Sequence, residues 1–478
     1  MALLWSGLML RKSRMAKELT KHKKYKSKYG QNELFWGLGI EEETYLQFTK
    51  PIFVATPIIR GCHAEERYSV NYYASFKPGY DKAFEKVFPD VSGCVPMPLF
   101  VNSHCLSKLN TDGIHDTTYE KVPKPNPKFK GKTLFTELQE FCPGVFKEEY
   151  EKNFTFDGDS IEFMTLDFYK ATVGATIKEL IDYKRAFLQK INAFLLEKKR
   201  WRDKGLLEWP RKNPGWAVFF SNPRNVAMFN NGTYHINITL PSLLGAKDID
   251  SDLPPPLLYP DIFQHQHKKA ILLYQWLEPL LIAVYGSPDP FSTSCMGFAK
   301  GSQRCAISRY IGVGTYDTSV MKEGKILTQE VAGIRGADMP FWWYGRFHAI
   351  SAYNGLNKIG LDINYKKHYN HGIELRFFDW FHEDWLGGLL TFLVGLADCA
   401  LDRPEVDEPA LSETWNDLVF GVFTEGGQFI MTGQMTGMYE KILGIELPEK
   451  INVLDGFALL AKEMKVKYKE GVCSRVML

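Results

Sequence analysis

The sequence lacks the paired cysteines of a zinc ribbon or a thioredoxin-type site, since its eight cysteines include no Cys-x-x-Cys spacing. It also lacks a charge excess, because 58 lysines and arginines stand against 56 aspartates and glutamates, a formal net charge of +2. A near-neutral chain gives no electrostatic footprint for nucleic acid, so we expect no nucleic-acid partner. Scattered cysteines in a large chain are typical of reduced thiols, which predicts a cytoplasmic location.

Long apolar runs, internal repeats and low-complexity tracts are missing as well. The apolar stretch 387–397 ends at Asp398, short of the roughly 20 residues that a membrane span needs, so we expect no membrane segment. Near the start, apolar residues precede nine Lys/Arg residues between positions 11 and 28, the reverse of the order in a secretory signal. We expect residues 1–30 to form a basic, poorly ordered tail, with an organelle presequence or an anion-contacting arm as alternatives.

The remaining chain has the composition of a folded globular protein, with 45% apolar and 24% charged residues. Hydrophobic periodicity predicts helices over 176–200, 261–285, 387–401 and 453–466, and strands over 35–48, 160–168, 234–240, 305–310 and 373–378. Strands and helices are mixed rather than alternating, which favours an α+β fold over a doubly wound sheet. We expect one domain over 31–478, with an irregular insertion rich in proline, lysine and aromatic residues at about 55–155.

Several expected strands carry polar side chains on one face and apolar side chains on the other, because the side-chain period of a strand is two residues. The polar positions are Glu41 and Glu43, Glu162, then His235, Asn237 and Thr239, and finally Glu374 and Arg376. One interpretation is an amphipathic sheet with a hydrated outer face. These faces, however, carry acids, imidazole, amide and guanidinium, with no lysine and few of the β-branched residues that usually coat an exposed strand.

If these faces converge, four carboxylates share one concavity. Their mutual repulsion and desolvation are prohibitive unless cations neutralise them. Hard divalent ions that prefer oxygen ligands are the natural candidates. The pattern therefore predicts a Mg²⁺ or Mn²⁺ site.

Six segments in this order resemble the glutamate–cysteine ligases, which belong to the glutamine synthetase-like carboxylate–amine ligases. The segments are Gly39-Ile-Glu-Glu-Glu43, Ile161-Glu-Phe163, His235-Ile-Asn-Ile-Thr239, Leu280 to Pro288, Ser302 to Ser308 and Ile373-Glu-Leu-Arg376. Each segment alone is weak, and the shared order gives the resemblance its weight.

The resemblance implies a curved, largely antiparallel sheet that forms a half-barrel active-site cavity and is backed by helices. In such a site Glu41, Glu43, Glu162 and Glu374 hold the metal ions, with His235 beside a metal. The nucleotide contacts are His235, Asn237, Arg304 and Arg376, of which His235, Arg304 and Arg376 take part in catalysis. Two alternatives remain open: His235 as a satisfied core histidine, and Arg304 as a structural ion-pair partner.

The implied activity is ATP-dependent amide-bond formation between a carboxylate, by resemblance the γ-carboxylate of glutamate, and an amine, both small molecules. One rival is a phosphoryl transferase of the guanidino-kinase type, whose fold is related. A second rival is a catalytically inactive binding or scaffold protein of the same fold. The sequence leaves the oligomeric state open, with a homo-oligomer among the alternatives.

Overall fold

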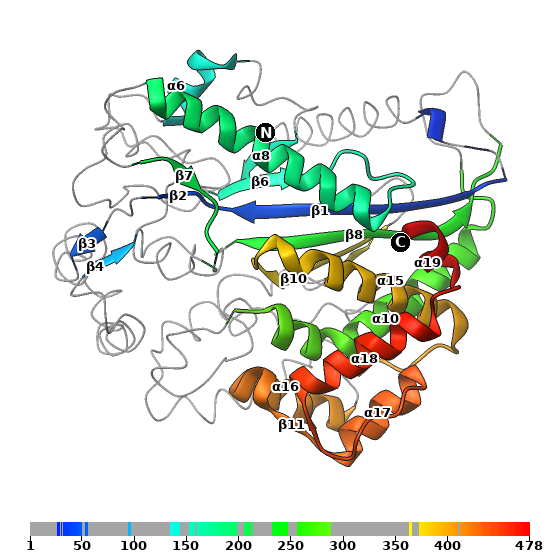
Figure 1. Cartoon of the computed structure of the whole chain (residues 1–478). Helices are drawn as coiled ribbons and strands as arrows, with labels where there is room; N and C mark the ends of the chain where they lie inside the picture. Colours follow the sequence, from blue (N-terminus) through cyan, green and yellow to red (C-terminus); the bar gives the residue numbers. More distant parts are fainter. Residues whose placement is uncertain are drawn as a thin grey trace, which may run out of the picture.

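A computed structural model describes residues 26–28, 30, 32–49, 53–55, 94–96, 134–143, 153–157, 160–197, 205–211, 213, 232–246, 256–287, 363–365, 372–409 and 412–478. Its centre is an antiparallel sheet of strand order β5-β6-β1-β8-β10-β9 (Figure 1). These strands are β5 (Phe154–Asp157), β6 (Ser160–Met164), β1 (Leu34–Thr44), β8 (Thr233–Leu243), β10 (Ile373–Asp379) and β9 (Ile363–Tyr365). The expected α+β class, with an antiparallel sheet packed against helices, is confirmed.

Helices cover one face of the sheet. The long helices are α8 (Val173–Glu197), α10 (Pro260–Tyr285), α15 (Leu386–Asp402) and α18 (Val453–Lys467). In Figure 1 α8 runs over β1 and β6, α10 lies against β8 and β10, and α15 packs between α8 and α10. The other helices are α6 (Leu134–Phe141), α16 (Glu413–Glu425), α17 (Gly433–Leu443) and α19 (Val472–Met477).

Short elements complete the described part of the chain. Three two-stranded ladders pair β2 (Gln47–Phe48) with β7 (Leu207–Glu208), β3 (Phe53–Ala55) with β4 (Cys94–Pro96), and β11 (Ile430–Met431) with β12 (Ile451–Asn452). The 3₁₀ turns are η1 (Lys26–Lys28), η8 (Glu383–Trp385) and η10 (Gly426–Gln428).

The main core lies between the sheet and these helices. The alternation of each central strand sends its apolar side chains to this side, as with Ile40 of β1, Ile236 of β8 and Leu375 of β10, all fully buried. The intervening polar side chains therefore project from the opposite face. A sheet buried on one face by helices thus presents its polar stripe on the other.

The four expected helices are confirmed, with ends within three residues of the expected bounds wherever those ends are described. The expected strand 35–48 is divided, since β1 ends at Thr44 and β2 pairs elsewhere. The strand expected over 160–168 ends at Met164, and the strand expected over 305–310 lies outside the described residues. Of the expected insertion at 55–155, the structure describes Ala55, 94–96, 134–143 and 153–155, and the domain boundaries stay predictions.

One helical segment, Glu383–Asp402, is long and apolar enough to cross a membrane by length and composition alone. The sequence argument that this apolar stretch is too short was therefore too strict. In the structure, 67% of the apolar 18-residue stretch in this segment is buried inside the protein. Helix α15 packs against α8, α10, α18 and α19. A buried core helix can be as long and as apolar as a membrane span. Length and composition alone are therefore weak evidence that this helix crosses a membrane.

An aromatic ring closes one end of the polar face. A side chain at Gly37 or Gly39 of β1 would project toward Phe168, whose ring occupies that space. The backbone of Phe168 also pairs with Leu38, with its carbonyl accepting from the Leu38 N–H at 3.0 Å. Phe168 belongs to a small apolar cluster with Phe35, Tyr169 and Leu244. The polar stripe thus ends at an apolar boundary beside the glycines.

We expect Gly37→Ala to lower the free energy of unfolding by about 1–3 kcal/mol, the usual range for overpacking. The added Cβ would lie 2.0 Å from Cε1 of Phe168, a ring that is buried and held by its neighbours. Gly437→Ala is the matched control, because nothing lies within 4 Å of its added Cβ in helix α17. That change is expected to stabilise by about 0.5–1 kcal/mol. Urea unfolding of both variants measures the difference, and equal effects would contradict the packing role of Gly37.

Candidate metal centre

The register of the central strands aligns polar residues in rows across the sheet. Glu41 of β1 lies opposite His235 of β8, and Asn237 of β8 lies opposite Glu374 of β10. Residues directly opposite each other in an antiparallel pair share a face. The three strands, which lie far apart in the sequence, therefore bring Glu41, His235, Asn237 and Glu374 to the face away from the helices.

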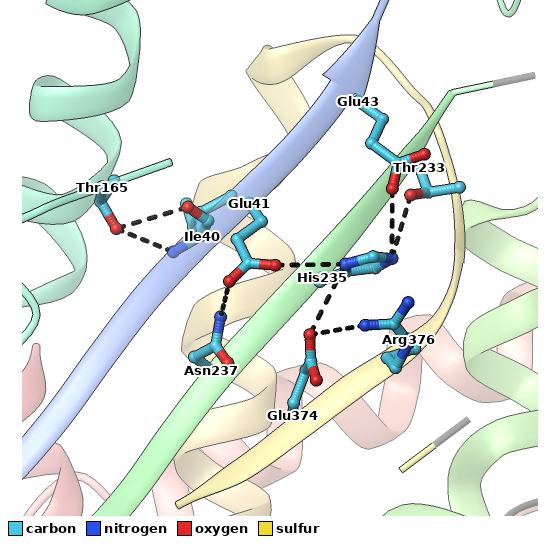
Figure 2. Close-up of polar contacts among 9 residues, drawn as sticks. All are labelled: Ile40, Glu41, Glu43, Thr165, Thr233, His235, Asn237, Glu374 and Arg376. Atoms are coloured by element: carbon cyan, nitrogen blue, oxygen red, sulfur yellow. Dashed lines mark hydrogen bonds and ion pairs between the residues drawn. The ribbon is translucent and has the colours of Figure 1, made fainter. Parts of the chain in front are cut away.

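The side chains from these rows converge around the imidazole of His235 (Figure 2). Its Nδ1 lies 3.4 Å from Oε2 of Glu41 and 3.6 Å from Oε1 of Glu374. Its Nε2 lies 3.2 Å from Oγ1 of Thr233 and 3.9 Å from Oε1 of Glu43. The ring is thus enclosed by three carboxylates and a hydroxyl.

Each carboxylate of the pair near Nδ1 has a further polar contact. Asn237 donates from Nδ2 to Oε1 of Glu41 at 3.4 Å, and Arg376 donates from Nη1 to Oε1 of Glu374 at 2.8 Å. The second contact is a charge-assisted hydrogen bond, the stronger kind. Both contacts fix the directions in which the carboxylates point.

Thr165 holds β1 at the residue before Glu41. Its backbone N–H donates to the Ile40 carbonyl at 3.0 Å. Its Oγ1 accepts from the Ile40 N–H at 3.0 Å and donates to the Ile40 carbonyl at 3.4 Å, and Figure 2 shows these two side-chain contacts. These contacts occur where β6 has ended and ordinary strand pairing stops. The side chain of Thr165 thereby continues the ladder and fixes the backbone from which Glu41 projects.

Burial and neighbouring charges shift two pKa values in the cluster. Burial lowers the pKa of His235 to about 3, with Arg376 acting in the same direction and Glu41 and Glu374 partly opposing them. The imidazole is therefore neutral near pH 7 and keeps a lone pair on one ring nitrogen. Burial alone would lower the pKa of Arg376, but Glu374, Glu43 and Glu41 outweigh it and raise this pKa above its ordinary value.

The donor set of this cluster fits a divalent cation. One ligand atom from each of Glu41, His235 and Glu374 lies within 4.8 Å of the others, and His235 and Glu374 are buried. Carboxylate oxygens suit Mg²⁺ and Mn²⁺, and imidazole extends the set toward transition metals. A cation among these side chains would also relieve the repulsion between neighbouring carboxylates.

The other candidate residues from the sequence lie in three different situations. Glu43 lies at the Nε2 side of His235, outside the group of three. Glu162 of β6 lies directly opposite Glu43 and so shares its face. Arg304 lies outside the described residues. Its two predicted roles, a contact to the nucleotide and a structural ion pair, therefore stay predictions.

Two polar residues that the strand register places on the face of the cluster were missed by the sequence reasoning. Asp379 of β10 is buried and lies opposite Thr233, which places it on the polar face. Alternation from Glu374 and Arg376 assigns that face to residue 378 instead. A register shift between Leu375 and Phe378 reverses the assignment, and such a bulge has no reliable sequence signal. Thr233 was missed because its hydroxyl lies just before the expected strand.

The fold and the site define an α+β protein with a carboxylate–imidazole cluster on the polar face of an antiparallel sheet. No protein-family model matches the chain. The chain is 37% identical over 457 residues to "Uncharacterized protein R704" of Acanthamoeba polyphaga mimivirus, an alignment that covers 95% of this chain and 79% of that protein. It belongs to the same family as this mimivirus protein.

Saturating Mn²⁺ is expected to stabilise the protein against heat. A ligand that binds only the folded state at 100 times its dissociation constant adds about 2.7 kcal/mol, so the unfolding midpoint should rise. Differential scanning calorimetry in MnCl₂, compared with EDTA plus KCl of equal ionic strength, measures this effect. The same shift in a Glu41→Gln variant would show that Mn²⁺ acts elsewhere.

Proposed function

We propose that this chain is an ATP- and Mg²⁺-dependent carboxylate–amine ligase that resembles the glutamate–cysteine ligases. The observation that supports this most is the meeting of Glu41, His235 and Glu374 on one sheet face. Their three segments follow one another in the order of the resemblance. We also propose that the sheet of this chain is glutamine synthetase-like and that its polar face lines a half-barrel cavity.

The proposed reaction has two steps. An oxygen of the substrate carboxylate, by resemblance the γ-carboxylate of glutamate, attacks the γ-phosphorus of ATP, and the bond to the ADP oxygen breaks. The nitrogen of the amine then attacks the acyl carbon of the acyl phosphate. The C–O bond to phosphate breaks, the nitrogen loses a proton, and the amide, ADP and phosphate are released.

Each residue of the cluster has a part in this proposal. Glu41, Glu374 and His235 would hold Mg²⁺, and Glu43 and Glu162 would extend the site to a second ion. Bound Mg²⁺ would neutralise charge on the phosphate oxygens, which is the main electrostatic demand of phosphoryl transfer.

The remaining polar residues would orient the metal-binding carboxylates and offset negative charge on the phosphoryl group. Asn237 holds Glu41 through a hydrogen bond from its amide. By resemblance, Asn237 would also contact the nucleotide. The guanidinium of Arg376 lies beside Glu374, where it can face charge on the transferred group. Arg304 has the same proposed role by resemblance alone.

A phosphate-release assay tests the proposal. The full-length protein is incubated with MgATP and glutamate, together with an array of amino acids and simple amines. Phosphate release that requires both an acid and an amine is expected. ADP formation with the phosphate retained on a guanidine compound would instead indicate a guanidino-kinase-type transferase. Absence of turnover together with absence of nucleotide binding would favour a scaffold protein. A small-molecule ligase in the cytoplasm remains the prediction.

A further inference from the structure

The helix-facing side of β1 carries a buried charged residue, Glu42, between two glutamates whose side chains face His235. Glu42 alternates with Glu41 and Glu43 and is 0% exposed. Its Oε1 accepts from Nζ of Lys184 at 2.9 Å and from Nε1 of Trp380 at 2.7 Å. A buried carboxylate needs such partners, and here they come from helix α8 and from the residue after β10.

Lys184 joins this carboxylate to a second one. The Nζ of Lys184 also donates to Glu383 of η8, and the Lys184 side chain is only 3% exposed. Burial alone would lower the pKa of Lys184, but Glu42 and Glu383 outweigh it and raise this pKa. The ammonium is therefore charged, and it joins helix α8 to β1 and to the segment that follows β10.

The network lies behind the same three strands that carry the candidate metal centre. Glu42 is next to Glu41 in β1, Trp380 follows directly on β10, and Tyr234 of β8 is next to His235. Tyr234 is fully buried, and Glu42 contributes to the raised pKa of its hydroxyl. On the helix side, Glu42 thus links β1 through its hydrogen bonds to helix α8 and to the residue that follows β10.

We propose that Lys184 is a positioning residue for the metal centre. By holding Glu42 and Glu383, it fixes the twist and the mutual placement of β1 and β10, and thereby the directions of Glu41 and Glu374. Partners behind metal ligands commonly set metal affinity in this way. This inference rests on the proposed metal-dependent function.

A purely electrostatic role of Lys184 predicts the opposite sign. Removing a buried cation makes the surroundings of the cluster more negative, which would tighten the binding of a divalent cation. Loss of positioning weakens the binding instead, because the ligand atoms no longer converge. A role in stability alone leaves the affinity of the folded protein unchanged.

The experiment compares Lys184→Met with Lys178→Met in the full-length protein. Lys178 lies on the same helix, but its side chain is 76% exposed and pairs with Asp182 on the surface. Mn²⁺ affinity is measured by electron paramagnetic resonance at a temperature where circular dichroism shows both variants folded. We expect affinity to fall about tenfold or more in Lys184→Met and to stay at the wild-type value in Lys178→Met.

A second variant guards against loss of folding. In Lys184→Met/Glu42→Gln the unpaired buried carboxylate is absent, so the fold recovers while the ion pair stays broken. Its Mn²⁺ affinity is expected to remain low. Unchanged or tighter Mn²⁺ binding in folded Lys184→Met or in the double variant overturns the proposal.

The design separates this inference from the proposed function. If the wild-type protein binds no Mn²⁺, the metal-dependent ligase fails first. The positioning role is then decided by the ring ¹⁵N signals of His235, which shift in Lys184→Met and not in Lys178→Met if Lys184 orients the cluster. Identical His235 signals in both variants overturn the inference.

Discussion

Glu41→Gln is expected to reduce the proposed MgATP-dependent turnover by about a thousandfold. Metal ions contribute several kcal/mol of charge stabilisation to such transition states, and each 1.36 kcal/mol or so is a factor of ten in rate. Glutamine keeps the shape of the side chain and an oxygen that can accept from Asn237, but it removes the negative charge. Steady-state kinetics over a range of Mg²⁺ concentrations measure the loss.

The same change should leave the metal-free protein as stable as the wild type or more stable. It removes one of three carboxylates around the His235 ring, and like charges at this distance repel. Thermal unfolding in EDTA checks this. Glu446→Gln, an exposed position after α17, is the control and should alter neither property. Wild-type turnover with an unchanged Mg²⁺ requirement in Glu41→Gln would exclude Glu41 as a ligand.

Lys184→Met is expected to lower the free energy of unfolding by about 3–5 kcal/mol, the typical effect of breaking a buried ion pair. The variant keeps the packing volume of the side chain but leaves Glu42, fully buried, without the cation opposite it. The change should appear as a lower urea midpoint with an unchanged dependence on urea.

Two further variants show whether charge is the cause. Lys178→Met removes a surface pair on the same helix, and such pairs contribute about 0–1 kcal/mol. Lys184→Met/Glu42→Gln removes both members of the buried pair, so its loss should be smaller than that of the single variant. Equal midpoints for Lys184→Met and Lys178→Met would contradict the energetic role of the pair.

The fold class and the long elements could be predicted because their signals are local. The helix over 453–466 follows from apolar residues at helical spacing, and the structure has it as α18 (Val453–Lys467). Alternation in β1 and β8 similarly predicts that the side chains of Glu41 and His235 lie on the polar face of the sheet. What alternation predicts is a face for each strand, and convergence follows only when the strand order is known.

The parts that could not be predicted depend on pairing and on distant contacts. The register shift in β10 brings Asp379 to the polar face, although counting by two assigns this face to its neighbour. Lys184 lies on the buried side of α8, where its pattern position indicates an apolar residue. Its partner Glu42 lies 142 positions away in the chain, so no local pattern could identify the pair.

The wide spacing of the cluster residues along the chain bears on how the protein folds. Glu41 and His235 are 194 positions apart, and strands that distant pair only after a long loop has closed, a step that slows folding. A cation can be held only once β1, β8 and β10 have assembled, so it cannot assist the earlier steps. Bound metal is therefore expected to lengthen the lifetime of the native chain by slowing unfolding, while the refolding rate stays as it is in EDTA.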